Sequence, residues 1–470
     1  MERSDFPSDF EQDERQVSNS SEPLDRFSEL PDSVIHFIFS FLPMEYVVRT
    51  TILSKRWKDL WTFVPYIYFQ AKEGELDEFT SFVNRTLMLW KGKKIQKFTI
   101  GFEDVYEPSS CTDLNLWVRF ALEHEVEELN LEYFYVNLDT NYWMPQRLFS
   151  CSSIRKLHIW DCNMEVSGKI HWDQLKSLTI QNVRWGQVEI DKVLSGSPQL
   201  EILTMYGSKN VSIHSGSLKK LFIDYDSHNH YGKEIDSVLK IWTPNLEVLE
   251  ISGSVYCKLL RMNVPSLVEA ALHFCIAISN DQEMVRDIFQ SIHHVEKLSL
   301  GNWLGNRCIK VLSVMEKNGL PSPLLNLKCL SVGAFIGKDV FAGIVNLLEI
   351  SPDVSILAIE IRDLRCSEAS RESIFRQTEE NFKSQIELPD SFMMSLKTVT
   401  ITWHANDNSM FSLIEFVLKN ASKLEKMVIR AKRIESVTSE LLFVIAQKLL
   451  RMPRSSPNAE VVLHRWDSED

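Results

Sequence analysis

The chain has 470 residues and a formal net charge of −13, with 44% hydrophobic and 24% charged residues. That length allows two or three domains, or one elongated domain. The negative charge argues against a general nucleic-acid-binding protein, because phosphate contacts need clustered lysine and arginine. No apolar run approaches the roughly 18 residues of a membrane-spanning helix, so we expect no membrane partner.

The eight cysteines lie far apart and form no C-x-x-C pair, which argues against a zinc site or a redox motif. The chain also has no Walker loop, G-x-G-x-x-G, G-x-S-x-G or H-E-x-x-H motif. We therefore expect a non-catalytic protein with no metal site and no cofactor. Free thiols are typical of a reducing compartment, here the cytoplasm or the nucleus.

Residues 1–24 are acidic and poor in hydrophobic side chains, which predicts a disordered tail and not a signal peptide. The next stretch, 25–70, is rich in apolar residues. They fall in two sets, beginning at Val34 and Leu53, each with the 3, 4, 7, 8 spacing of one helix face.

Local signals divide this stretch into three short helices. Pro31 suits a first helical turn, Pro43 should end the first helix, and Ser54 suits the N-cap of the third. Helices this short cannot bury all of that apolar surface among themselves, so we expect another protein to cover part of it.

Three motifs in this stretch resemble the F-box in its plant form: LPDS at 30–33, FLP at 41–43 and LSKRWK at 53–58. The resemblance implies docking onto a Skp-type adaptor and, through it, onto a cullin–RING ubiquitin ligase. The alternative is a helical hairpin packed only on its own domain. We expect the adaptor interface to contain Leu30, Pro31, Ile35, Ile38, Val47, Leu53 and Trp57.

Beyond the helices a six-residue template recurs, with apolar residues at its first, fourth and sixth positions. It is met at 95–100, 126–131, 154–159, 175–180, 200–205, 218–223, 246–251, 267–272, 295–300, 327–332, 354–359, 396–401 and 424–429. The starts recur about every 27 residues, within the roughly 20–29 of leucine-rich repeats.

The second half of each template alternates as a short strand does, with its middle residue facing solvent. Thr179, Thr204, Glu250, Ser299 and Thr400 hold that position. Helical pieces such as 190–194 should lie between the strands. The resulting fold class is α/β: an irregular, right-handed leucine-rich-repeat solenoid over 71–384, with a strand and a helix in every unit and the strands on its concave face.

A polar segment at 363–394 breaks the repeat, and a solvated loop is favoured there over a binding loop. The following stretch, 385–463, resembles the FBD domain through LKTVTI at 396–401 and LKNASKLEKMVI at 418–429. It departs from that family in lacking a cysteine near its start and in carrying Trp403-His404. Such a domain would cap the last repeat, leaving 464–470 as a tail.

Other polar clusters are weaker candidates, and for each a solvated or half-buried surface segment is the favoured interpretation. They are Asp224, Asp226, His228 and His230 as a metal site, His293 and His294, the basic stretch 90–94, and Arg430, Lys432 and Arg433.

Together these features predict a substrate-recognition subunit of an SCF-type ligase, whose concave face recruits a protein target that the sequence does not identify. A second hypothesis is a small-molecule sensor on the same scaffold. It would use scattered cationic residues, namely Arg184, Lys209, Lys258 and Arg307. An enzyme ranks last, because no nucleophile–base pair is recognisable.

Overall fold

The computed structural model describes most of the chain. The described residues are 30–71, 76–102, 111–133, 144–160, 165–183, 185–208, 211–225, 238–255, 259–276, 281–301, 312, 321–334, 338–361, 393–403, 409–432 and 439–466. The predicted loop insertion at 363–394 lies almost wholly outside them.

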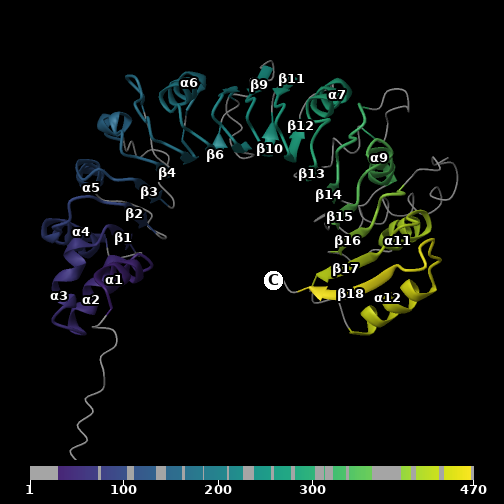
Figure 1. Ribbon diagram of the computed structural model, residues 1–470, viewed down its shortest axis with the longest axis horizontal. Coiled ribbons are helices and arrows are strands. Elements are labelled where there is room, and N and C mark those ends of the chain that lie inside the picture. The colour runs from purple at the N-terminus through teal and green to yellow at the C-terminus, as the bar shows by residue number, and fades with distance from the viewer. Residues whose placement is uncertain are drawn as a thin grey trace, which may run out of the picture.

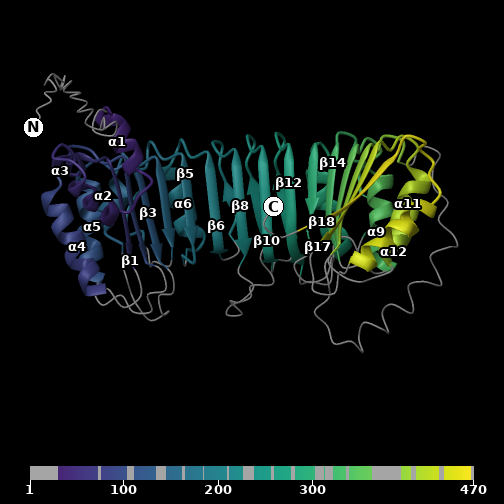
Figure 2. The ribbon, with the colours of Figure 1, turned by 90° about the horizontal axis from the view of Figure 1, so that it is seen from below.

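One long parallel sheet runs through the molecule, and Figure 1 shows it bent into an arc with the strands on the inner side and helices outside. Figure 2 shows the strands side by side along the length of the arc. In spatial order they are β1 Tyr66–Ala71, β2 Lys97–Phe102, β3 Glu128–Tyr133, β4 Lys156–Trp160, β5 Ser177–Gln181, β6 Ile202–Ser208, β8 Lys220–Tyr225, β10 Val248–Val255, β12 Glu269–Ile276, β13 Lys297–Leu300, β14 Cys329–Ala334, β15 Ile356–Ile361, β16 Thr398–Trp403, β17 Lys426–Lys432 and β18 Glu460–Trp466.

Helices precede the sheet and cover parts of its convex side. The N-terminal group contains α1 Asp32–Phe39, α2 Met44–Arg49, α3 Trp57–Leu60 and the 3-10 turns η1 Thr50–Ile52 and η2 Trp61–Phe63. The helices of the solenoid are α4 Leu76–Leu89, α5 Cys111–Glu123, η3 Gln146–Ser150, α6 Gln187–Gly196, α7 Asp281–Ser291, α9 Lys338–Glu349, α11 Ser409–Asn420 and α12 Ser439–Arg451. Helices followed by a parallel-strand solenoid are what the sequence predicts.

Repeat residues stack directly on one another and form a continuous core. Phe98 pairs in register with Leu129, Leu129 with Leu157, and Leu157 with Leu178. All four side chains are buried. The predicted solvent-facing residues are only half-buried on the concave side, as the template requires; they are Thr179, Thr204, Glu250, Ser299 and Thr400.

Opposite charges pair across neighbouring strands at the beginning of the sheet. Glu128 on β3 lies between Lys97 on β2, at 3.0 Å, and Lys156 on β4, at 3.4 Å. Because a slip of one residue would separate every such pair, the pairs favour the observed register. Lys297–Glu269 is the equivalent pair on β13 and β12, and three further pairs lie one residue before their strands: Lys219–Glu201, Lys328–Glu296 and Lys397–Glu425.

The convex side differs from the prediction of a helix in every unit. In the middle of the arc it carries a second parallel sheet, made of β7 Ile213–His214, β9 Val238–Trp242 and β11 Leu259–Asn263. Strands suit this position because Leu239, Ile241 and Leu260 alternate with exposed residues at a period of two.

Two predicted boundaries also move. The boundary at 70 falls inside β1, because 64–69 fits the repeat template and β1 pairs in parallel with β2. The boundary between 463 and 464 falls inside β18, which pairs with β17 through Trp466. The sheet is therefore longer at both ends than the sequence predicts.

Candidate functional site

Two prolines define the start of the first two N-terminal helices. The carbonyl of Pro31 accepts hydrogen bonds from the N–H groups of Val34 and Ile35, at 2.9 and 3.1 Å. Pro43 caps α2 in the same way through Tyr46 and Val47. Each proline is the residue before its helix and not part of its first turn, so Pro31 lies one position earlier than predicted.

Ser54 acts at the beginning of the third helix, although α3 itself starts later, at Trp57. The Ser54 hydroxyl accepts a hydrogen bond from the Arg56 N–H at 3.2 Å, and the Ser54 carbonyl accepts one from the Trp57 N–H at 3.1 Å. The serine therefore organises the turn that leads into α3.

A small core holds the three helices together, and it corrects part of the predicted interface. Ile35, Phe39, Met44, Val47 and Trp57 are all buried, and the rings of Phe39 and Trp57 meet edge to face at 5.7 Å. Ile35, Val47 and Trp57 therefore offer almost no surface to a partner. They can influence docking only by fixing the shape of the module.

The remaining predicted interface residues are accessible. Pro31 is exposed and Leu30 half-buried, while Ile38 and Leu53 are exposed, Leu53 to 66%. Other exposed apolar side chains of this module went unpredicted; they are Val34, Phe37, Phe41, Tyr46, Ile52 and Phe63. We call all these accessible residues together the apolar surface of the helical module.

Phe41 shows why the sequence alone did not separate buried from exposed apolar residues. Helical spacing places it on the same face as Ile38, but α1 ends at Phe39 and a turn follows. Phe41 consequently lies 69% exposed, with its ring against Phe37 at 5.1 Å. The stop signal at Pro43 could have indicated this, because the residues just before proline leave the helical conformation.

The module is fixed to the start of the sheet, so only part of it is accessible. The Trp90 indole N–H donates to the Val64 carbonyl at 2.9 Å, and the Lys91 N–H donates to the Thr62 carbonyl at 2.7 Å. The basic stretch 90–94 thus has a structural role at this joint. A cavity of about 250 Å³ remains between α2, β1 and α4, lined by Pro43, Met44, Glu45, Phe69, Gln70, Glu78, Phe79 and Phe82.

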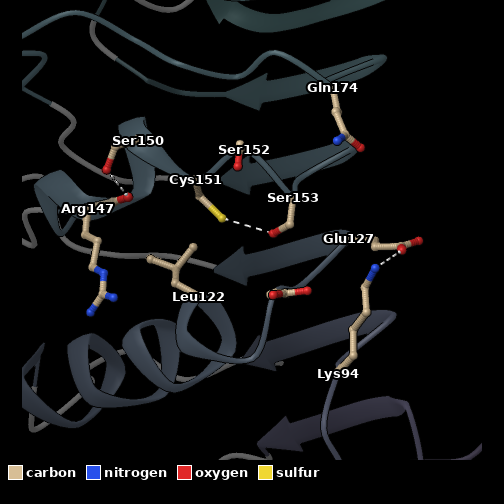
Figure 3. A pocket seen from close by; sticks show the side chains of 10 residues that line it. Lys94, Leu122, Glu127, Arg147, Ser150, Cys151, Ser152, Ser153 and Gln174 are labelled. Carbon is tan, nitrogen blue, oxygen red and sulfur yellow. Dashed lines mark hydrogen bonds and ion pairs between the residues drawn. The ribbon is translucent and has the colours of Figure 1, made fainter.

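A larger polar cavity of about 400 Å³ lies where α5 and η3 approach the starts of the strands (Figure 3). Its two cationic side chains have partners: Lys94 pairs with Glu127 at 2.6 Å, and Arg147 with Glu123 at 3.1 Å. Cys151 contacts Ser153 at 3.2 Å. This mixture of compensated charges and hydroxyls favours water and gives no single ligand chemistry.

The pKa values of two carboxylates on β3, Glu128 and Glu132, are shifted in opposite directions. Burial opposes ionisation of Glu128, but hydrogen bonds and charge attraction from Lys97 and Lys156 outweigh it and lower its pKa. Burial raises the pKa of Glu132, against a smaller opposing effect of Lys97. Burial, and then Lys97, lower the pKa of His158 on β4.

The remaining candidates gain little support. His293, which is exposed, and His294, which is half-buried, bond to backbone carbonyls in a turn. Of the proposed metal cluster only Asp224 is described, and within the described ranges no three potential ligands converge. Arg433 and all the cationic residues of the sensor hypothesis, Arg184, Lys209, Lys258 and Arg307, lie outside the described residues. No helix in the described part has both the length and the apolarity to cross a bilayer.

Comparison with known proteins gives two family matches. Residues 87–443 match the LRR domain of the At1g61320/AtMIF1 family, and residues 27–67 match the F-box domain. Similar Arabidopsis thaliana proteins include F-box/LRR-repeat protein At5g02910, 28% identical over 88% of this chain and 90% of that protein. Another is F-box/FBD/LRR-repeat protein At5g56420, 26% identical over 93% of this chain and 98% of that protein.

Proposed function

The chain belongs to the At1g61320/AtMIF1 leucine-rich-repeat family and carries an F-box before the repeats, and from this premise we propose that it is the substrate-recognition subunit of an SCF-type cullin–RING ubiquitin ligase. The F-box docks onto a Skp-type adaptor, and the solenoid holds a protein target. The chain itself breaks no bond. It raises the effective concentration of a target lysine near the conjugating enzyme, in the cytoplasm or the nucleus.

The apolar surface of the helical module is the observation that carries this proposal. Exposed aromatic and branched side chains crowd about thirty residues, while the described contacts with the solenoid lie at α2, which faces β1, and around Thr62 and Val64. An apolar surface of this kind on a folded monomer marks a protein interface. Leu30, Pro31, Ile38 and Leu53 form our proposed adaptor contacts, joined by Phe41.

The C-terminal units support a finer assignment. We propose that 385–463 is an FBD-type domain built into the end of the solenoid, with right-handed crossovers as in almost all parallel strand connections. Its described part alternates β16, α11, β17, α12 and β18. The relative At5g56420, which aligns with almost the whole chain, carries FBD in its name.

Co-purification tests the adaptor proposal. The full chain is mixed with a recombinant Skp-type adaptor, and the complex is quantified by size-exclusion chromatography. Leu53→Asp should abolish the complex, because it places a charge where an apolar contact is needed. The matched control is Leu116→Asp on α5, where Leu116 is 57% exposed and far from the module along the chain. Equal complex formation by Leu53→Asp and wild type would contradict the proposal.

A further inference from the structure

Five neighbouring strands carry a continuous row of aromatic and polar side chains across the concave face. Trp160 on β4 pairs in register with Gln181 on β5, Gln181 with Tyr206 on β6, and Tyr206 with Asp224 on β8. Glu132 on β3 extends the row, because it follows the last paired residues of β3 and β4. We call these five residues the aromatic row.

The row faces the hollow of the arc and not the core. The residues that precede it on β4, β5 and β6 point inward and are buried; they are Ile159, Ile180 and Met205. Since successive strand residues point to opposite faces, the row residues must point to the concave side. Their exposure agrees: Trp160 and Gln181 are half-buried and Tyr206 is 42% exposed.

The chemistry of the row suits cationic side chains. The faces of tryptophan and tyrosine rings attract guanidinium and ammonium groups. Glu132 and Asp224 place a carboxylate at each end, where such groups can donate charge-assisted hydrogen bonds. Burial already disfavours the charge of Glu132 and raises its pKa, so a cationic partner there would relieve a cost that solvent only partly offsets.

Lysines on the same face do not cancel this preference. Lys97, Lys156 and Lys220 lie at the opposite ends of their strands, four residues before the row, which corresponds to about 13 Å at the rise of a β-strand. Lys97 and Lys156 pair with Glu128, at 3.0 and 3.4 Å. Lys97 acts on Glu132 from this distance, but more weakly than burial does, so Glu132 still gains from a cationic partner.

The backbone around Tyr206 is fixed by an irregularity in the sheet. The pairing of β6 with β8 shifts register between Tyr206 and Ser208, and the intervening Gly207 has φ +64°. A Cβ on Gly207 would meet the Asn182 amide oxygen at 2.3 Å, and the Asn182 N–H donates to the Tyr206 carbonyl at 2.9 Å. Bulges of this kind redirect a neighbouring side chain, and they are frequent beside binding sites.

The other arm of the arc lacks these features. In the same position, β12, β14, β15 and β16 carry His273, Gly333, Glu360 and Thr402, and Gly301 directly follows β13. None of these residues is a tryptophan, tyrosine or phenylalanine, and two are glycines. The aromatic row is thus a local feature of the arm nearer the F-box, and does not follow from the repeat.

We propose that the aromatic row binds an extended segment of the target that carries arginine or lysine side chains. The assignment rests on the proposed recruitment function and names the class of target. Four strand intervals of about 4.8 Å give the row a length of about 19 Å, which equals about six residues of extended chain. The aromatic rings would hold the cationic groups, and Glu132 and Asp224 would pair with them.

A random decapeptide display library, presented to the full-length chain, tests this proposal. Bound peptides should be enriched in arginine and lysine, and replacing these by citrulline or acetyl-lysine should weaken binding at least about tenfold, the usual scale of a charge-assisted contact. Trp160→Ala and Glu132→Gln should each weaken the binding of a selected peptide by about fivefold or more. The double variant Glu132→Lys, Asp224→Lys should select acidic peptides instead.

Two matched variants serve as controls. Trp242→Ala removes a tryptophan that is 37% exposed on the convex β9, and Glu360→Gln removes a carboxylate at the equivalent position of β15. Both should bind the selected peptide like wild type. Thermal unfolding of every variant separates lost binding from lost folding.

Several outcomes would overturn the assignment: no enrichment of basic residues, equal binding by Trp160→Ala and wild type, or tight binding of a twelve-residue oligothymidylate that Trp160→Ala abolishes. Adaptor binding, measured on the same preparations, keeps the two proposals apart. If peptide selection succeeds and the adaptor does not bind, only the ligase role fails; if the adaptor binds and no basic peptide is selected, only the aromatic row fails.

Discussion

The helical module and the solenoid solve the same problem of apolar burial in opposite ways. In the solenoid each repeat covers its neighbour, so Phe98, Leu129 and Leu157 are almost inaccessible. In the helical module a small core around Phe39 forms, and much of the remaining apolar surface stays open. The difference teaches that the solenoid is complete as a fold, whereas the helical module keeps an open apolar surface, which under the proposed function the adaptor covers.

The largest effect should come from the solenoid core. Trp172 is fully buried, and its indole N–H donates to the Leu148 carbonyl at 2.8 Å. Trp172→Ala should lower the free energy of unfolding by about 3–5 kcal/mol, because it leaves a large cavity and an unpaired carbonyl. Urea denaturation followed by circular dichroism measures this. A loss below about 1 kcal/mol, similar to that of Trp242→Ala, would contradict the proposed burial.

Substitutions in the apolar surface of the helical module should weaken adaptor binding and have little effect on the free energy of unfolding. Leu30→Ala combined with Pro31→Ala should weaken adaptor binding by about 2 kcal/mol or more, the size expected of central interface residues. Its effect on unfolding should be small, because Pro31 is exposed. Isothermal titration calorimetry with the adaptor measures the loss; unchanged affinity, with intact unfolding, would remove these residues from the interface.

A smaller effect tests how tightly neighbouring repeats approach. Gly253 on β10 has φ +85°, and a Cβ there would lie 1.9 Å from the carbonyl oxygen of Tyr225 on β8. Gly253→Ala should destabilise the solenoid by about 1–3 kcal/mol, because both the backbone conformation and the contact must change. Gly216→Ala is the control, since nothing lies within 4 Å of its Cβ position. Equal melting temperatures of the two variants would contradict the strain.

The smallest effects concern the charges on β3. The pKa of Glu128 is lowered from 4.5 in the folded chain, so its contribution to stability is present above about pH 4.5 and is lost as the pH falls through the folded pKa. Glu128→Gln should cost less than about 1 kcal/mol at pH 7, because the pairs are half-exposed. The difference from wild type should disappear under acidic conditions and shrink in high salt.

On the same strand, ionisation of Glu132 should have the opposite effect on stability. Its folded pKa is raised by burial, so its ionisation opposes folding once the pH exceeds the unfolded value of about 4.5. Glu132→Gln should therefore leave stability at pH 7 unchanged or slightly raise it, while Glu128→Gln lowers it. Chemical denaturation at several pH values measures both, and the same direction of change for the two variants would contradict this account.

Much of the solenoid is predictable from the sequence, because each apolar position of the template corresponds to one buried side chain of a strand or the turn before it. Even β1 could have been found, since Val64, Ile67 and Phe69 fit the template. β18 is harder to find, because Asn458 stands at the first, apolar position of the template although Val461 and Leu463 fit it. The second, convex sheet also went unpredicted, because short apolar alternations between repeats give no strong signal.

The candidate site was predictable only in location. Both faces of the short helices are apolar, so the sequence could not separate Ile35 and Val47, which hold the module together, from Ile38 and Leu53, which lie open. The aromatic row was hidden for another reason. Each member directly follows the last template residue, where the residue type is not fixed by the repeat, and the members become neighbours only through strand pairing.

The two ends of the long sheet are not alike. β1 pairs only with β2 and has α2 against it, whereas β18 pairs with β17 and has no further strand beside it within the described chain. A second molecule that tried to continue the sheet from β18 would have to offer its own β1, which its helices obstruct. The geometry thus discourages head-to-tail filaments, in which β18 of one molecule would pair with β1 of the next.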